Sequence, residues 1–252
     1  MARDSVTLER AGGVARITLD RPPLNILDLA MAAALADALD QAAGAHVLVL
    51  AGAGRAFCAG VDVLDHVGER AAPMLAGFHG VIRRLLRFEG PVIAEVGGAA
   101  LGGGCELLLA CDVVFAGEGA MLGQPEIRLG VFPPVAAALL PGLVGRQRAL
   151  DLILSGRVLD AEEACAIGLV NRVFAADRLR DEVAAYVRGL ETLSRPVLRL
   201  AKRAAAADGV TRAIAAIAAA ERIYLDELMK LPDAHEGLVA FIEKRAPRWK
   251  GD

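Results

Sequence analysis

The sequence predicts an α/β protein in which helices connect the strands of a mostly parallel sheet. Three observations support this fold class: apolar strand-like runs alternate with helical patterns in the first half, a glycine-dense turn joins a strand to a helix, and helical patterns dominate after Pro134. Consecutive strands that are separated by helices pair in parallel through right-handed crossovers. We therefore expect the loops that follow these strands to meet at one edge of the sheet, where ligands bind.

The first half of the chain carries the predicted sheet. Two alternating runs form a hairpin whose turn is made by Ala11, Gly12 and Gly13. Asp28 is a suitable N-cap for the first helix, and the continuous apolar run after that helix is typical of a strand buried on both faces. The predicted strands span residues 5–10, 14–19, 46–51 and 91–96, and the predicted helices span residues 29–42, 73–88 and 103–111. A further strand follows the last of these helices.

The second half is predicted to be almost entirely helical. One short strand, at residues 169–174, interrupts the helices. The helix that begins near Thr211 is rich in alanine, and its small side chains allow close packing against a neighbouring helix or another subunit. The predicted helices span residues 135–144, 146–154, 161–167, 179–190, 197–207, 211–229 and 234–244.

Composition and charge argue against several classes of protein. The net charge is −3 and no long run of either sign occurs, which gives little support to nucleic acid as a partner. Charged residues such as Glu95, Glu106 and Asp112 interrupt the apolar runs, so we expect no membrane-spanning helix. The first residues lack the apolar core of a secretion signal and the length of a transit peptide. We therefore expect a cytoplasmic protein without a membrane partner.

Several catalytic motifs are absent from the sequence. The glycine cluster matches neither the Walker A motif nor GxGxxG, and no serine lies in GxSxG. The four cysteines form no CxxC or zinc spacing and the four histidines form no HExxH, so we expect buried thiols and no metal site. His66 and His79 flank the glycine cluster and could line a site there, but we favour a solvent or core position for each.

The stretch from Pro91 to Pro134 contains the candidate site. Glycines at positions 102–104 let the backbone approach a ligand closely. A helix that begins there presents unpaired N–H groups, which suit developing negative charge. The other glycine-rich loop, residues 52–62, follows a neighbouring parallel strand, so N–H groups of both loops could converge on one ligand atom. Glu106 and Glu126 flank this candidate oxyanion site.

Both glutamates allow a structural interpretation as well as a catalytic one. Glu106 lies at a helix N-terminus, which favours negative charge, and Glu126 could be an exposed loop acid paired with Arg128. Apolar neighbours favour desolvation of both carboxylates, which would raise their pKa values into a range useful for acid–base catalysis. A glycosidase also uses two carboxylates, but the sequence is only 4% aromatic with one tryptophan, whereas sugar sites usually stack aromatic rings.

Five segments resemble motifs of the crotonase superfamily, the enoyl-CoA hydratase/isomerase group. They are AFCAGVD (56–62), GGAALGGGCEL (97–107), GQPEIRLGV (123–131), LSGRVLDAEEACAIGLVNRV (154–173) and EGLVAFIEKRAPRWKG (236–251). They occur in the family's order and cover nearly the whole chain. The resemblance implies a crotonase-like ββα spiral core with the active site over residues 1–190. It also implies a helical C-terminal trimerisation region over residues 191–252, within the same structural unit.

By the same resemblance, the ligand is an acyl-CoA thioester, and no separate cofactor is needed because coenzyme A is part of the substrate. Homotrimers, and hexamers built from two trimers, are usual in the family. The backbone N–H groups of Val61 and Gly103 match the oxyanion hole that holds the thioester oxygen. Glu106 and Glu126 match the two acids that deprotonate water and deliver a proton to the α-carbon. The remaining positions expected to bind the substrate are Ala59, Gly60, Asp62 and Gly102.

The sequence also departs from the family pattern. Common hydratases carry a PGxGGTQRL segment after the second acid, whereas residues 131–145 read VFPPVAAALLPGLVG, which implies a bulkier and stiffer wall of the acyl pocket. Leu64 occupies a position that is often a lysine contacting the CoA phosphates. The GQPEIRLGVF run and the segment near the C-terminus resemble the branch of the family that hydrates cyclohexa-1,5-diene-1-carbonyl-CoA.

The activity that this resemblance implies is hydration of an activated C=C bond in an enoyl-CoA or cyclic dienoyl-CoA thioester. The presence of both acids favours hydration over the other reactions of the superfamily. Two alternatives stay open. One is double-bond isomerisation or another crotonase-type reaction, and the other is a catalytically silent subunit that binds acyl-CoA.

Overall fold

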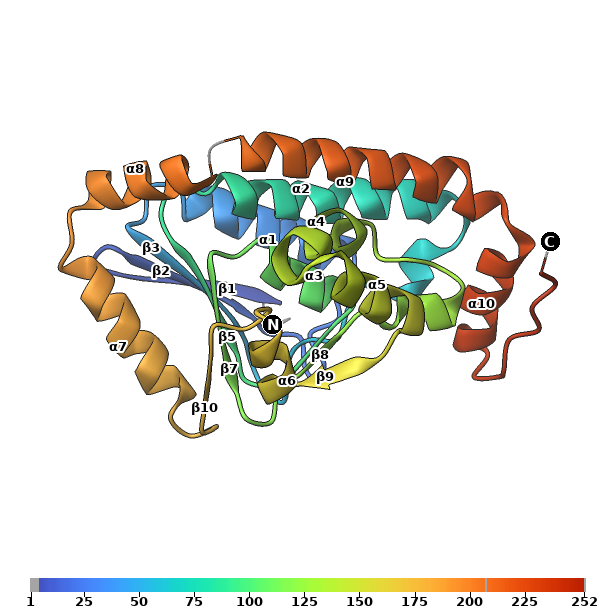
Figure 1. Ribbon diagram of the computed structural model, residues 1–252, viewed down its shortest axis with the longest axis horizontal. Coiled ribbons are helices and arrows are strands. Elements are labelled where there is room, and N and C mark those ends of the chain that lie inside the picture. Colours follow the sequence, from blue (N-terminus) through green and yellow to red (C-terminus); the bar gives the residue numbers. More distant parts are fainter. Residues whose placement is uncertain (1–4, 207, 252) are drawn as a thin grey trace.

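The computed structural model describes residues 5–206 and 208–251. Two sheets are wrapped by helices, and α2 (Ala71–Arg87) lies beside α9 (Gly209–Asp226) along one side of the molecule (Figure 1). The larger sheet has the strand order β1 (Val6–Ala11), β2 (Val14–Leu19), β3 (Val47–Gly52), β5 (Val92–Val96), β7 (Val113–Gly117) and β10 (Arg172–Phe174).

The pairing of the larger sheet confirms the predicted hairpin and the predicted parallel strands. β1 pairs with β2 in antiparallel orientation, and β2, β3, β5, β7 and β10 then follow in parallel. Leu48 and Leu50 of β3 face the main core, whereas Val47 and Val49 pack with α7 (Leu179–Glu191) on the opposite face. The continuous apolar composition of this strand therefore reflects burial on both faces.

The structure contains a smaller second sheet, which the sequence did not predict. Two of its strands fall inside residues 52–62 and 97–104, which the sequence predicts to be an irregular loop and a turn. Strands of three residues are too short to show the two-residue alternation that reveals longer strands. The sheet has the order β4 (Ala56–Cys58), β6 (Ala99–Leu101), β8 (Met121–Gly123) and β9 (Val158–Asp160).

The two sheets are built by a repeating spiral of the chain. β3 leads into β4 and then α2, and β5 leads into β6 and then α3 (Gly103–Leu109). β7 leads into β8, the 3₁₀ helix η3 (Pro125–Leu129) and α4 (Pro134–Val144). Each turn of the spiral thus adds one strand to each sheet and one helix, which confirms the crotonase-like ββα core. Because β4, β6 and β8 are adjacent, the loops that follow them lie together.

The other predicted elements are confirmed within a few residues, with two exceptions. Asp28 caps α1 (Leu29–Gln41) by accepting a hydrogen bond from the Met31 N–H at 2.8 Å. The predicted strand at 169–174 is wrong in its first half, because turns and bends precede β10. The predicted helix at 197–207 ends at a residue outside the described part of the chain. The remaining helices are α5 (Arg146–Ser155), α6 (Ala161–Ala166), α8 (Arg195–Ala206) and α10 (Pro232–Ile242).

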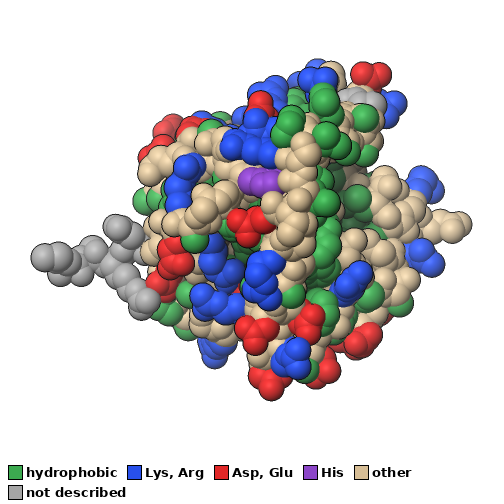
Figure 2. Space-filling model, turned by 90° about the vertical axis from the view of Figure 1, so that its left-hand side faces the viewer, with side chains coloured by type: hydrophobic (Ala, Val, Ile, Leu, Met, Phe, Trp, Pro, Cys, Tyr) green, Lys and Arg blue, Asp and Glu red, His purple; other side chains and the backbone are tan. Residues whose placement is uncertain are grey.

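Figure 2 shows the face of the molecule that carries α7 and α8. Basic and acidic side chains are interspersed on it, with hydrophobic side chains between them. α8 has no buried residue, and its Val197 and Leu200 are 61% and 52% exposed. This face therefore presents apolar side chains without a large field of one sign. Within the described part of the chain, every helix is too short or too polar to cross a membrane.

A C-terminal clasp, formed by α10 and the tail that follows it, holds the turn at the end of η3. Gly130 follows η3 with a φ of +74°. Gly237 of α10 lies so close to the Leu129 carbonyl that any side chain there would overlap it. The Trp249 ring lies against both glycines. Asp233 fixes the tail by accepting hydrogen bonds from two of its N–H groups, at 2.7 and 3.1 Å.

We expect Gly104→Ala to lower the free energy of unfolding by about 1–3 kcal/mol, because overpacking forces backbone shifts. Gly104 lies in the first turn of α3 against the Cys58 carbonyl of β4, and an added methyl group would overlap that carbonyl. Urea denaturation followed by circular dichroism measures the change. The matched control is Gly77→Ala in α2, where the methyl group meets open space. The control should gain about 0.5–1 kcal/mol, and an equally stable Gly104→Ala protein would contradict the contact.

Candidate active site

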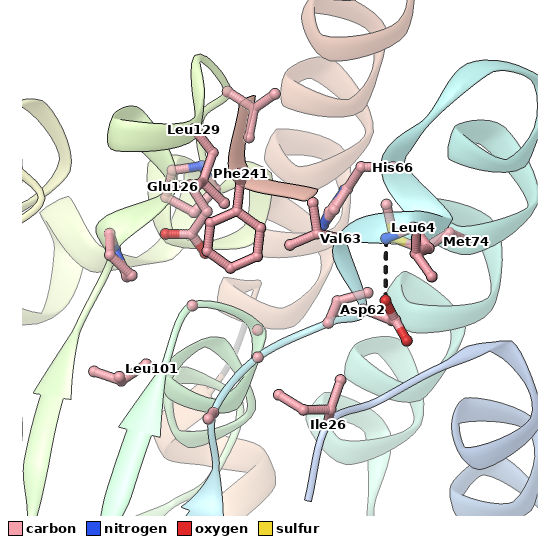
Figure 3. Close-up of a pocket in the computed structure, with 18 of the residues that line it drawn as sticks. Ile26, Asp62, Val63, Leu64, His66, Met74, Leu101, Glu126, Leu129 and Phe241 are labelled. Carbon is pink, nitrogen blue, oxygen red and sulfur yellow. Dashed lines mark hydrogen bonds between the residues drawn. The ribbon is translucent and has the colours of Figure 1, made fainter. Parts of the chain in front are cut away.

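A pocket of about 1200 Å³ lies where the loops after β4, β6 and β8 meet. Its walls also include residues of α2, α9 and α10, so the helical C-terminal part of the chain helps to close it. Figure 3 shows Glu126 and Phe241 directed into the space between η3 and the short helical turn that carries Val63 and His66. The pocket therefore combines the glycine-rich loops with side chains that are distant in sequence.

The loop after β4 presents the Val61 N–H to the pocket. A parallel bridge joins Val61 to Leu27: the Leu27 N–H donates to the Gly60 carbonyl at 2.9 Å, and the Asp62 N–H donates to the Leu27 carbonyl at 2.8 Å. In such a bridge the N–H of the middle residue points away from the partner strand. The Val61 N–H is thereby turned toward α3.

Gly103 supplies a second N–H close to the first. Gly102 turns the chain with a φ of +52°, and Gly103 begins α3 directly after it. A methyl group on Gly103 would lie 3.4 Å from the Val61 nitrogen, and one on Gly60 would lie 4.0 Å from the Gly103 nitrogen. Among the described residues, neither the Val61 nor the Gly103 N–H donates a hydrogen bond. Two free donors therefore lie side by side at the pocket.

Glu106 is buried on α3, one turn after Gly103. Its Oε1 accepts a hydrogen bond from the Ala136 N–H at 2.8 Å, at the N-terminal end of α4. Burial raises the pKa of Glu106 to about 7, while the N–H groups of Ala136 and Val135 oppose this rise. Glu106 is therefore a fixed carboxyl group that ionises less readily than an exposed one.

Glu126 lies on η3 and faces the same pocket. Its Oε1 lies against Gly102, where an added methyl group would come within 2.6 Å, and its Oε2 is buried without a hydrogen-bond partner among the described residues. Burial, followed by the charge of Glu106, raises the pKa of Glu126 well above its usual range. The pairing with Arg128 is wrong, because the Arg128 side chain is exposed and no ion pair joins these two described residues.

The remaining predicted site residues also line the pocket. Ala59, Gly60, Asp62 and Gly102 all belong to its lining. Asp62 turns its carboxylate to the start of the 3₁₀ helix η1 (Val63–His66), where it accepts a hydrogen bond from the Leu64 N–H at 3.0 Å (Figure 3). This side chain therefore shapes the loop. The structure brings all eight predicted positions to one cavity.

Several residues of the pocket were not among the predicted site residues. His66 lines it, which corrects the solvent or core position favoured above. His79 also borders the pocket, but its side chain is fully buried, which confirms the core position favoured for it. Tyr224 of α9 and Phe241 of α10 belong to the same lining. They lie about 100 residues beyond the glutamates in the chain, and no local pattern marks them. Only the fold brings them to the site.

Basic residues stand at the opening of the pocket. Leu64, where a lysine is common in the family, is 53% exposed. Lys244 and Arg128 have no ion pair among the described residues, and Arg21 and Arg245 pair with acids. Among the residues that the structure describes, no group of three or more His, Cys, Asp or Glu side chains is arranged to hold a metal ion. All four cysteines are free thiols, two of them buried.

Comparison with known proteins gives consistent results. The Enoyl-CoA hydratase/isomerase family model matches residues 9–252. The chain is 42% identical to cyclohexa-1,5-dienecarbonyl-CoA hydratase of Thauera aromatica, over 97% of this chain and 96% of that protein. It is 37% identical to 2,3-dehydroadipyl-CoA hydratase of Escherichia coli, over 97% of this chain and 98% of that protein.

Solved structures agree with this assignment. The crystal structure of carnitinyl-CoA hydratase from Mycobacterium avium superposes with a TM-score of 0.88 at 33% identity, over the full length of both chains. An enoyl-CoA hydratase from Mycobacterium avium subsp. paratuberculosis gives a TM-score of 0.87 at 31% identity, over 98% of both chains. The match therefore extends over the spiral, both glycine-rich loops and the C-terminal helices, and the chain belongs to the enoyl-CoA hydratase/isomerase family.

Proposed function

We propose that this protein adds water across an activated C=C bond of an enoyl-CoA or cyclic dienoyl-CoA thioester. The observation that carries the proposal is the convergence of the buried Glu106, the partly buried Glu126 and two free backbone N–H groups on one pocket. Water addition needs a base for the water, an acid for the α-carbon, and stabilisation of the enolate that forms between these steps. The four groups supply these functions.

In this proposal, the N–H groups of Val61 and Gly103 bind the thioester oxygen. Negative charge grows on this oxygen when water attacks the β-carbon. Fixed donors that are aimed at this charge stabilise the transition state without reorganisation, and removing one such donor in other enzymes costs about 2.7–4 kcal/mol. The free state of both N–H groups supports this role, because an occupied donor could not take a second strong acceptor.

The two glutamates divide the proton transfers. Two carboxylates in one buried site cannot both ionise easily, so the pair holds one proton around neutral pH. We assign that proton to Glu126, whose pKa is raised by burial and by the charge of Glu106, and which therefore acts as the acid toward the α-carbon. Glu106 is kept in place by the Ala136 N–H and acts as the base that activates water. This chemistry uses neither a metal nor a redox cofactor.

The names of the relatives support an acyl-CoA substrate, since each is described as acting on a CoA thioester. The basic residues at the pocket opening suit the phosphates of coenzyme A, with Lys244 and Arg128 in place of the missing lysine at position 64. Phe132, Pro133 and Pro134 form a rigid apolar wall. This wall suits a compact acyl group, and the Thauera aromatica relative makes a cyclic dienoyl group our first choice.

We also propose that the protein assembles as a homotrimer or as a hexamer of two trimers, through the helical region at residues 191–252. The exposed Val197 and Leu200 of α8 support an interface on this region. Multi-angle light scattering reports the mass directly, and a monomer at all concentrations would contradict this assembly.

Glu106→Gln and Glu126→Gln should each lower kcat for hydration by about 100- to 10,000-fold, the usual contribution of a positioned acid or base. Binding of a saturated acyl-CoA should persist, because each substitution keeps the shape of the side chain. Product analysis with 2-enoyl, 3-enoyl and cyclic dienoyl thioesters measures both hydration and isomerisation. The control is Glu162→Gln on the surface of α6, which should retain full activity. Wild-type rates in both variants would contradict the acid–base assignment.

The pH profile of kcat/KM should be bell-shaped. Activity should fall below about pH 7, where Glu106 takes up a proton and can no longer act as a base. It should fall again at high pH, where the pair loses the proton that we assign to Glu126. Initial rates in overlapping buffers of constant ionic strength give the profile. A flat profile between about pH 5 and pH 10 would contradict a catalytic pair that shares one proton.

Gly103→Ala keeps its N–H but should lower kcat/KM by about 100- to 1,000-fold, the effect that loss of one oxyanion donor has elsewhere, because its methyl group would obstruct the hole. The methyl group would lie 2.7 Å from the Val61 side chain and 3.4 Å from the Val61 nitrogen, in the space that the proposal gives to the thioester oxygen. Gly97→Ala is the control, since its methyl group meets open space. Steady-state kinetics of both variants, with unfolding curves to confirm folding, make the comparison. A change of less than twofold in Gly103→Ala would contradict the proposed hole.

A further inference from the structure

His79 and Glu221 form a hydrogen-bonded pair that links α2 to α9 beside the pocket. His79 Nδ1 lies 2.7 Å from a carboxylate oxygen of Glu221. The imidazole is fully buried, whereas the Glu221 side chain is 26% exposed. His79 is also the one polar side chain among the buried residues of α2. The chemistry proposed above uses neither residue.

The second nitrogen of the His79 ring has no partner. Nε2 is buried and makes no hydrogen bond to any of the residues that the structure describes. The bond to Glu221 accounts for a polar residue between the two helices, but it uses Nδ1 alone. A buried polar atom without a partner costs free energy, and such atoms are uncommon in native proteins. Nε2 therefore indicates a partner that comes from outside the chain.

The pocket lies on the side of the ring that carries Nε2. His79 belongs to the lining of the pocket and Glu221 does not, so the ring lies between the carboxylate and the pocket. The two nitrogens of an imidazole face away from each other, and Nδ1 faces Glu221. Nε2 therefore faces the pocket, and a ligand bound there is the partner that can reach it.

The bond to Glu221 decides which nitrogen of His79 carries the proton. A carboxylate only accepts hydrogen bonds, so the proton lies on Nδ1. Burial lowers the pKa of His79, although the hydrogen bond to Glu221 opposes this, so the ring is neutral around pH 7. A neutral ring with its proton on Nδ1 has a lone pair on Nε2. Nε2 is therefore an acceptor, and its partner must be a donor.

His79 is further from the two acids of the site than Tyr224 is. Burial, followed by the charges of Glu126 and Glu106, raises the pKa of Tyr224 on the same pocket wall. The acid that acts on the pKa of His79, after burial, is Glu221. A group at Nε2 therefore belongs to the part of the acyl group that lies beyond the reacting carbons.

We propose that His79 Nε2 accepts a hydrogen bond from a hydroxyl group on the acyl part of the thioester, beyond the carbons that react, and that Glu221 positions the ring for this contact. A keto or carboxylate oxygen only accepts, so it would face the lone pair of Nε2. An ammonium group donates, but it would bring a charge into a largely apolar wall. A plain hydrocarbon would leave Nε2 without a partner. This inference rests on the proposed function and names its substrate class as hydroxylated enoyl-CoA or cyclic dienoyl-CoA thioesters.

The test uses sets of unsaturated acyl-CoA thioesters with one carbon skeleton, linear or alicyclic. The members of a set carry a hydroxyl group, a keto group or only hydrogen at the same carbon, and this carbon is varied beyond the β-carbon. For the wild-type protein, kcat/KM should be at least about tenfold higher for the hydroxylated member at one of these positions. Equal values, or a preference for the keto or the plain member, at every position would overturn the subsite.

His79→Leu should lower kcat/KM about 10- to 100-fold for the preferred hydroxylated thioester and change it less than about threefold for the plain member. The matched control is His46→Leu, because His46 Nε2 is also buried without a partner among the described residues but lies outside the pocket lining. This control should keep the hydroxyl preference. Equal losses on both thioesters in His79→Leu would show a merely structural role and overturn the subsite.

Glu221→Leu tests the positioning of the ring without changing His79. Without the carboxylate, the proton can move to Nε2, so the preference for the hydroxyl over the keto member should fall at least about fivefold. An unchanged preference would overturn the role of Glu221. Nitrogen NMR with isotope-labelled histidine reads the tautomer of the wild-type ring directly, with His79→Leu identifying the signals. A proton on Nε2 in the wild-type protein would overturn the acceptor.

A binding experiment separates this inference from the proposed hydration. Calorimetry with saturated acyl-CoA thioesters, with and without the hydroxyl group, measures the preference without any reaction. A preference that His79→Leu abolishes and His46→Leu keeps would support the subsite even if no thioester is hydrated. Hydration without any such preference would overturn the subsite and leave the proposed function standing.

Discussion

The close approach of two backbone segments from successive turns of the spiral is the constraint on which the site depends. Gly104 lies against the Cys58 carbonyl, and Gly103 lies against Val61, so the start of α3 touches the loop after β4 without side chains between them. This contact sets the spacing of the two free N–H groups. It also fixes Glu106, one turn further along α3. Everything that we assign to the oxyanion hole follows from this one backbone contact.

The site also contains an unfavourable electrostatic arrangement, which selection for stability alone would remove. Two carboxyl groups share a buried pocket, and one oxygen of Glu126 has no hydrogen-bond partner among the described residues. The protein relieves only half of this conflict, since the Ala136 N–H at the start of α4 stabilises charge on Glu106. Such unsatisfied polar groups are concentrated at functional sites, where local stability is exchanged for reactivity. The asymmetry between the two acids is what allows different roles for them.

The sequence predicted some levels of this structure better than others. The strands of the larger sheet were accessible because β3 and β5 are long enough to show their apolar character. The three-residue strands of the smaller sheet were not, since β4 and β6 carry no periodic signal and lie among glycines. The glutamates stood out as charges in apolar surroundings, and the family motifs supplied Val61 and Gly103. Tyr224 could not be predicted, because its place on the pocket wall follows only from how α9 packs across the core.

The C-terminal clasp links the most distant part of the chain to the acid of the site. Trp249 covers Gly130 and Gly237, and Gly130 ends the turn that carries Glu126. A substitution at Trp249 can therefore disturb the backbone that carries Glu126, although Trp249 itself does not line the pocket.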